Sequence, residues 1–184
     1  PIIAIPTTAG TGSEVGGGSV LITDDGHKVV IVSPNLIPKM AICDPELTLS
    51  LPKHLTAATG MDAMAHCIEA FLTPAINPPA AAIALDGLER VVTYLKRAVD
   101  DGNDRDARWN MMMAASEGAM AFAKGLGSVH SMSHAVGANE ELQAHHGTLN
   151  ALFLPTVLRF NTAHVGDKYA QLRRAMGLPA KANI

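Results

Sequence analysis

Apolar and polar residues follow two different patterns along this chain, and the pattern changes near residue 50. Residues 1–6 form a short apolar run, which is typical of a fully buried strand. Two segments of alternating and β-branched residues, 18–24 and 28–33, predict a hairpin around a turn at 24–26. Residues 36–47 predict one more strand, which ends at Asp44-Pro45. We therefore expect β-structure over about the first 45 residues.

Apolar residues at helical spacing replace this pattern beyond residue 50. An Ala-rich helix is predicted over roughly 53–72, with Pro52 at its start. A second helix is expected from Pro78 to about residue 99, and Asp104 is a suitable N-cap for a third. Shorter helices are predicted over 128–137, 146–161 and 167–176. The basic residues of the long helices are interpreted as solvated: Arg90, Lys96, Arg97, Arg105 and Arg108.

Composition limits the possible classes of protein. Of 184 residues, 48% are hydrophobic and 17% are charged, which favours a globular, often oligomeric protein over a disordered one. The net charge of −3 argues against a nucleic-acid or anionic-membrane partner. No apolar run reaches the ~18 residues that a membrane span requires. Cys43 and Cys67 lack metal-like spacing, so a reducing cytoplasm fits best. We expect the chain to be cut from a longer protein.

The helix predicted over 53–72 carries a candidate metal site. Asp62 and His66 are four residues apart and share one helix face, among small and apolar neighbours where an unpaired carboxylate would be costly. The same helix carries Glu69 one turn further on. It is either close to this candidate site or simply a charge on the helix face. Surface carboxylate–histidine pairs are common, so this pair alone does not establish a metal site.

Four of the eight histidines cluster later in the chain, at positions 130, 134, 145 and 146. His145 and His146 are neighbours and cannot both face one point, so at most one of them is a ligand. Spacing alone does not choose among the four. Together with Asp62 and His66 they predict a site of three imidazoles and one carboxylate around a divalent transition metal.

Residues 7–14 (TTAGTGSE) follow the first predicted strand and are rich in small and hydroxyl residues. Such a loop exposes backbone N–H groups that suit a phosphate or ribose, although an ordinary turn is the simpler reading. It lacks the G-x-G-x-x-G order of the dinucleotide fingerprint. The run at 16–19 leads into a strand and is better explained by backbone packing.

Several of these segments, in this order, closely resemble the iron-containing (group III) alcohol dehydrogenase family. The resemblance extends over nearly the whole chain, and the stretches that carry it are 5–15, 41–52, 56–71, 125–138 and 145–161. The resemblance implies an α+β fragment: residues 1–48 would be the C-terminal part of a Rossmann-like dinucleotide-binding α/β domain. Residues 49–184 would be an all-helical, metal-binding domain, truncated at its C-terminus. Metal and substrate would lie between the two domains.

The resemblance also implies roles for individual residues. The metal ligands would be Asp62, His66, His130 and His146. His134 matches a family histidine that is not a ligand but lies near the nicotinamide and helps to move the proton. Residues matching a cofactor-contacting loop are Thr7, Thr8, Gly12, Ser13 and Val15, while Lys28 and Leu47 would line the rest of the cofactor pocket. The implied cofactors are Fe²⁺, with Zn²⁺ as the alternative, and NAD or NADP.

Some alternatives remain open at this stage. The family usually has proline before the last ligand, whereas this chain has His145; we favour His146 because the H-G-x-x-N-A motif continues from it. A metal-independent, maleylacetate-reductase-like enzyme shares the fold, a metallohydrolase uses similar ligands, and an incomplete fragment would be non-catalytic. The expected substrate is a small alcohol, aldehyde or hydroxy acid, and the expected assembly is a homo-oligomer such as a dimer.

Overall fold

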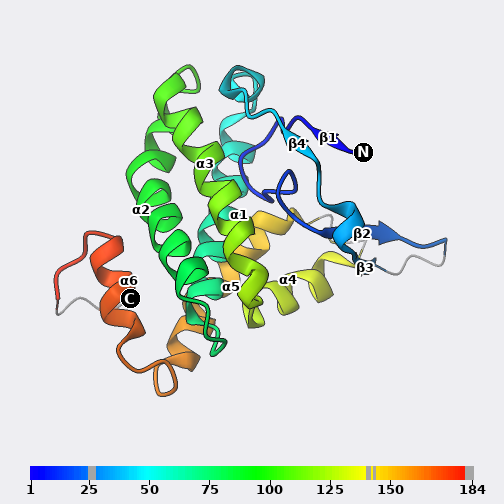
Figure 1. Ribbon diagram of the computed structural model, residues 1–184. Helices are drawn as coiled ribbons and strands as arrows, with labels where there is room; N and C mark the ends of the chain where they lie inside the picture. Colours follow the sequence, from blue (N-terminus) through cyan, green and yellow to red (C-terminus); the bar gives the residue numbers. More distant parts are fainter. Residues whose placement is uncertain (25–27, 140–141, 143, 181–184) are drawn as a thin grey trace.

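Helices form most of the structure, a computed structural model that describes residues 1–24, 28–139, 142 and 144–180. Three long helices, α1 (Lys53–Leu72), α2 (Pro78–Asp100) and α3 (Arg105–Ala121), pack against one another (Figure 1). Helices α4 (Ser128–Gly137) and α5 (His146–Asn161) pack together, and α5 also packs on α1. A short helix, α6 (Lys168–Ala175), contacts α2 and α1.

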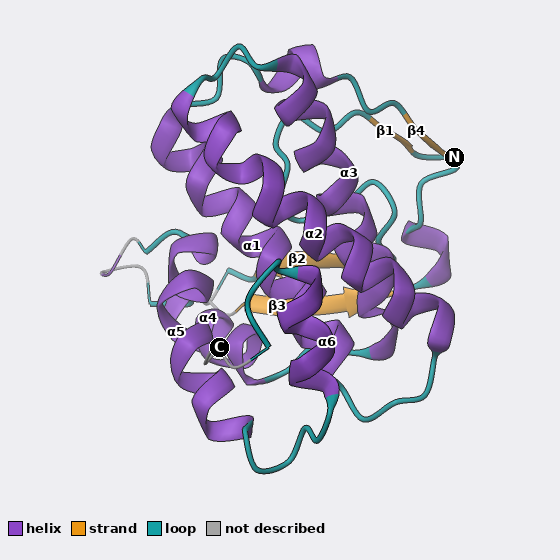
Figure 2. Ribbon diagram, turned by 90° about the vertical axis from the view of Figure 1, so that its left-hand side faces the viewer, coloured by secondary structure: helices purple, strands orange, loops and turns teal. Residues whose placement is uncertain are grey.

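The strands form two small, separate sheets (Figure 2). Strands β1 (Ile3–Ala4) and β4 (Met40–Ala41) pair in parallel, whereas β2 (Gly18–Ile22) and β3 (Lys28–Val32) form an antiparallel hairpin in which Val20 faces Val30. Short 3₁₀ helices cover Pro34–Leu36, Pro45–Thr48 and Phe122–Lys124. The predicted mixed fold, mostly helical with little sheet, is confirmed.

Local sequence explains where the long helices begin. Pro52 precedes α1, and the Asn77 side chain accepts a hydrogen bond from the backbone N–H of Ala80 at the start of α2. The predicted cap of α3 is present, because Asp104 accepts from the N–H of Ala107 at 3.0 Å. Helices observed at 53–72, 128–137 and 146–161 have the predicted bounds.

Small residues allow the long helices to approach closely. A Cβ atom at Gly118 of α3 would lie 3.0 Å from the Cβ of His66, and one at Gly60 of α1 would lie 2.2 Å from Leu95 of α2. Helix α1 is therefore buried along most of its length between its neighbours. The main apolar cluster includes Ile68 of α1 and Leu88 of α2.

Three sequence expectations were wrong. Of the strand predicted within 36–47, only Met40–Ala41 is a strand, and 3₁₀ helices cover both ends of that segment. The strand predicted at 1–6 is short, since within the described residues only β4 pairs with it, and its isoleucine side chains are exposed rather than buried. Arg108, interpreted as solvated, is 3% exposed and donates to Thr56 Oγ1 at 2.8 Å and to the Gly102 carbonyl at 3.0 Å. Of the predicted turn at 24–26, residues 25 and 26 lie outside the described part of the chain. Among the described residues, no helix is long and apolar enough to cross a bilayer.

Candidate metal centre

Helix α1 supplies two of the predicted ligands from its buried middle section. Asp62 and His66 are each 4% exposed, and Asp62 Oδ1 lies 3.8 Å from His66 Nε2. Their spacing of four residues places both side chains on one face, as the sequence predicts. The helix thus presents a carboxylate oxygen and an imidazole nitrogen in the same dry region.

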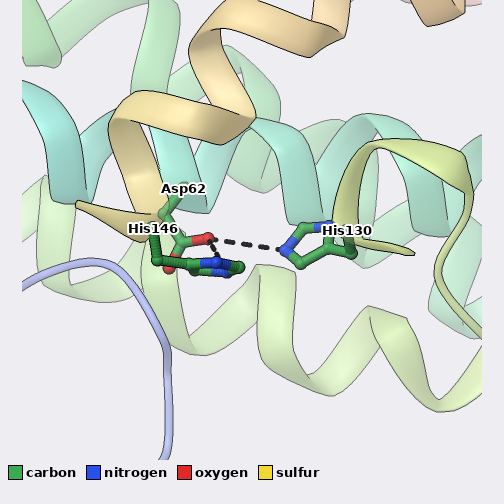
Figure 3. A group of neighbouring side chains, drawn as sticks. All are labelled: Asp62, His130 and His146. Carbon is green, nitrogen blue, oxygen red and sulfur yellow. Dashed lines mark ion pairs between the residues drawn. The ribbon is translucent and has the colours of Figure 1, made fainter. Parts of the chain in front are cut away.

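Helices α4 and α5 bring two further imidazoles to the same carboxylate. Asp62 Oδ1 lies 3.4 Å from Nε2 of His130 and 3.5 Å from Nε2 of His146, the first residue of α5 (Figure 3). One ligand atom from each of these three residues lies within 4.8 Å of the other two. The ring of His66 stacks on His130 with a centroid distance of 4.5 Å. Three Nε2 atoms therefore lie within 3.8 Å of one carboxylate oxygen. The group of described residues whose ligand atoms all lie within 4.8 Å of one another includes His130 and His146 but not His66.

The close approach of α5 to α1 depends on Gly147. A Cβ atom at this position would lie 2.0 Å from the carbonyl oxygen of Ala58. Glycine directly after His146 therefore allows the first turn of α5 to press against α1 and to bring His146 next to Asp62. His145, by contrast, is exposed at the N-cap of α5.

Asn150 is a member of the site that our sequence analysis missed. It is fully buried, and its Nδ2 donates to Asp62 Oδ1 at 2.7 Å and lies 3.2 Å from Nε2 of both His130 and His146. Its Oδ1 has no hydrogen-bond partner among the described residues. The signal was its position four residues after His146, which places both on one face of α5.

Glu69, for which the sequence left open the reading of a charge on the helix face, is buried instead. It is 5% exposed, and its Oε2 lies 2.7 Å from Nδ1 of His130. Spacing alone showed that Glu69 lies one turn beyond His66. Only the packing of α4 against α1 reveals its partner.

Burial and mutual contacts set the charges of the cluster. Burial alone would raise the pKa of Asp62, but contact with His130 and the neighbouring imidazoles outweigh it and lower that pKa to about 2. Burial lowers the pKa of His66 to about 4. At neutral pH Asp62 is therefore ionised and His66 is neutral, so both have lone pairs available to a cation.

His134 lies beside the cluster rather than within it. Its ring is 4.9 Å from the ring of His146 and 6.4 Å from that of His130, measured between centroids, and the residue is half-buried on α4. The Oγ of Ser133 lies 3.3 Å from Nδ1 of His146. The predicted role of His134 in moving a proton stays a prediction.

The predicted cofactor loop rests on α3. Gly12 adopts φ +64°, and a Cβ there would lie 2.3 Å from the Ala115 carbonyl oxygen. Glu14 is buried and accepts a hydrogen bond from Ser116 of α3. The remaining predicted contacts of this loop are exposed or half-buried: Thr7, Thr8, Ser13 and Val15.

The other two predicted cofactor residues lie outside this loop. Leu47 is 43% exposed in the 3₁₀ helix at Pro45–Thr48. Lys28 begins β3, and its side chain lies outside the described part of the structure. The cofactor assignments stay predictions.

The donor set fits a divalent transition metal. One carboxylate and three imidazoles are ligands that Fe²⁺ and Zn²⁺ accept. A buried, ionised Asp62 gains from a cation beside it. The fold and these donors define a helical protein with a candidate metal-binding cluster.

Comparison with known proteins identifies the family. The model of the Fe-containing alcohol dehydrogenase family, C-terminal, matches residues 56–183, and the model described as iron-containing alcohol dehydrogenase matches residues 1–45. The chain belongs to the iron-containing alcohol dehydrogenase family. It is 61% identical to a 4-hydroxybutyrate dehydrogenase of Cupriavidus necator, covering 100% of this chain and 50% of that protein.

Other relatives and solved structures agree. A NAD-dependent methanol dehydrogenase of Bacillus methanolicus is 41% identical over 96% of this chain and 46% of its own length. The crystal structure of a 1,3-propanediol oxidoreductase matches with a TM-score of 0.94 at 38% identity, covering 100% of this chain and 48% of that one. An iron-containing alcohol dehydrogenase of Thermococcus thioreducens matches with a TM-score of 0.88 at 37% identity, covering 96% and 46%. The chain thus spans about half the length of the relatives it matches.

Proposed function

We propose that this chain is part of a metal-dependent, NAD(P)-linked alcohol dehydrogenase that interconverts an alcohol and an aldehyde or ketone by hydride transfer. The observation that carries the proposal is Asp62 Oδ1, which lies within 3.8 Å of Nε2 of three histidines in a member of this family. Such a cluster of buried donors is costly unless it serves a cation.

In this proposal Asp62, His66, His130 and His146 hold the metal. Fe²⁺ is the expected ion, and Zn²⁺ is the alternative. When bound, the metal acts as a Lewis acid that lowers the pKa of an alcohol. Asn150 holds the Asp62 carboxylate through its 2.7 Å hydrogen bond, and among the proposed ligands the side chain of His146 is the most exposed, at 35%.

The remaining roles concern the nicotinamide cofactor, which is NAD or NADP and accepts the hydride. His134, beside His146, would move the proton. The loop from Thr7 to Val15 would contact the cofactor, with Lys28 and Leu47 lining the rest of its pocket. We propose a domain boundary near residue 48, between a cofactor-binding part and a helical metal-binding part.

The relatives guide the choice of substrate. The 61% identity to a 4-hydroxybutyrate dehydrogenase favours a short hydroxy acid, and the 1,3-propanediol and methanol relatives favour small alcohols in general. A dimeric assembly in the cytoplasm stays a prediction. The metal-independent alternative, resembling a maleylacetate reductase, is disfavoured because this chain keeps the whole predicted donor set.

Two adjacent histidines provide a matched test of the metal site. We expect His146→Ala in the complete protein to lose its metal on dialysis, because one of the four donors is removed. His145→Ala should retain it, since His145 is exposed at the N-cap. Elemental analysis of both variants and of the wild type gives the metal content. Full retention in His146→Ala, or a wild type without metal, would contradict the proposal.

A further inference from the structure

We propose that Glu69 is a positioning residue that fixes the tautomer of His130, so that the Nε2 lone pair of this ring points at the metal position. This inference rests on the proposed metal site and goes beyond its four ligands. Glu69 follows Asp62 and His66 on the same face of α1, at a spacing of seven and three residues. One helix thus carries two of the proposed ligands and the residue that positions a third.

Three donors converge on the Glu69 carboxylate. Its Oε1 accepts from the backbone N–H of Val129 at 2.8 Å, and its Oε2 accepts from the backbone N–H of His130 at 3.2 Å. The third contact joins Oε2 to Nδ1 of His130 at 2.7 Å. A carboxylate only accepts hydrogen bonds, so Nδ1 carries a hydrogen in this contact, and in the neutral ring Nε2 then keeps its lone pair.

The opposite nitrogen of the same ring faces the cluster. Nε2 of His130 lies 3.4 Å from Asp62 Oδ1, on the side where the other imidazoles converge. Hydrogen bonding of the second ring nitrogen to a carboxylate is a general way to orient a metal-binding histidine and to raise its basicity. The ring of His130 thus has a carboxylate next to each nitrogen, Glu69 at Nδ1 and Asp62 at Nε2, and all three residues are buried.

The backbone at the start of α4 is shaped to admit this carboxylate. A Cβ atom at Gly127 would lie 2.5 Å from Oε1 of Glu69, closer than any real Cβ contact. Glycine directly before α4 therefore allows Glu69 to reach the first N–H groups of the helix. The same contacts cap the helix, so a purely structural role of Glu69 is the competing explanation.

The variant Glu69→Gln separates the two roles. The amide offers one acceptor oxygen instead of two, so an NH₂ group faces either the Val129 N–H or the His130 contacts, and the negative charge beside Nδ1 is lost. In the complete protein we expect the zinc dissociation constant, measured by chelator competition, to rise about 10–100-fold. A merely structural role predicts a lower unfolding midpoint with the zinc dissociation constant unchanged.

Glu117→Gln is the matched control, because it makes the same carboxylate-to-amide change on α3, where Glu117 pairs with Arg90 of α2. We expect its zinc dissociation constant to stay within about 3-fold of the wild-type value. The same result for Glu69→Gln would overturn the inference.

A measurement on the wild type does not depend on any variant folding. In the zinc-loaded complete protein with ¹⁵N-labelled histidine, we expect His130 to show a protonated Nδ1 and a zinc-bound Nε2. An unprotonated Nδ1 in a protein that binds zinc would overturn this inference alone. A wild type that binds no zinc would overturn the proposed function and, with it, the role of Glu69.

Discussion

Gly12 and Gly166 share a left-handed backbone conformation but have very different surroundings. Their φ angles are +64° and +54°. A Cβ at Gly12 would lie 2.3 Å from the Ala115 carbonyl oxygen and 2.4 Å from the Ala119 side chain, whereas a Cβ at Gly166 would meet nothing within 4 Å. The pair therefore separates backbone strain from steric overlap between the predicted cofactor loop and α3.

We expect Gly12→Ala to lower the free energy of unfolding by about 2–5 kcal/mol, because backbone strain adds to overpacking. Gly166→Ala should cost only the backbone part, about 1–2 kcal/mol. Urea unfolding of both variants of the complete protein checks the difference. Equal losses would mean that the loop moves away from α3 without cost.

Single residues of the site differ in how far sequence alone could place them. Asp62 and His66 were predictable as neighbours, because a spacing of four residues on one helix places both side chains on the same face. His145 and His146 could not be separated by spacing. Their difference arises from the start of α5, which leaves the first exposed and places the second 3.5 Å from Asp62.

Partners that lie far apart along the chain were beyond sequence reasoning. Arg108 was interpreted as solvated because it is charged, but Thr56 of α1 accepts a hydrogen bond from it in the buried interior. Asn150 acquires its role only where three helices meet. Thr56, the acceptor for Arg108, and Asp62, the acceptor for Asn150, each belong to another element, so local periodicity carries no information about them. Only the position of Asn150 on the same face of α5 as His146 was readable from spacing.

At the scale of elements, helices were predicted well and strands less well, for a physical reason. Periodicity, caps and proline positions are local signals, and they located α1, α4 and α5 to the residue. A strand requires a partner to satisfy its backbone. The hairpin, whose strands are neighbours in sequence, was predicted, but β1 extends only over Ile3–Ala4, where β4 pairs with it.

The start of α2 depends on the side chain of Asn77, because the helix begins with two prolines. Pro78 and Pro79 have no backbone N–H, so Ala80 carries the first N–H of the helix that needs an acceptor. Asn77 Oδ1 accepts this bond at 3.2 Å. We expect Asn77→Ala to lower the free energy of unfolding by about 1 kcal/mol.

Asn103→Ala is the control for this change, since Asn103 is an exposed residue of the loop before α3 and caps no helix in the described structure. Its effect should stay below about 0.5 kcal/mol. Thermal or urea unfolding of both variants measures the difference. A loss in Asn103→Ala as large as in Asn77→Ala would show that the cap of α2 contributes nothing.

At the scale of the whole molecule, the candidate metal centre lies where α1, α4 and α5 meet, next to the main apolar cluster. Ile68 and Val129, which belong to this cluster, are sequence neighbours of Glu69 and His130. Packing of the apolar side chains therefore places the polar ones. At a second position, outside the candidate metal centre, burial makes a carboxylate costly to ionise.

That carboxylate is Glu117 on α3, whose side chain is 17% exposed and faces Arg90 of α2. Burial, together with the neighbouring Asp86 carboxylate, raises the pKa of Glu117 to about 7 from its ordinary value of 4.5, although Arg90 opposes the shift. Between these two values the folded protein holds a proton that the unfolded chain has lost. The free energy of unfolding must therefore fall as pH rises through this window.

We expect Glu117→Gln, which is neutral at every pH, to remove this dependence. The variant and the wild type should be similarly stable at pH 4.5, where Glu117 is largely protonated in the folded protein. Above pH 7 the variant should be more stable, by at most about 3 kcal/mol, because the wild type there carries a buried charge that Arg90 only partly offsets. Urea unfolding of the complete protein at pH 4.5 and pH 8 measures both differences. If the stability of the variant fell with pH as steeply as that of the wild type, other groups would be responsible for the pH dependence. If the variant were less stable than the wild type at pH 8, the bond to Arg90 would outweigh the cost of burial.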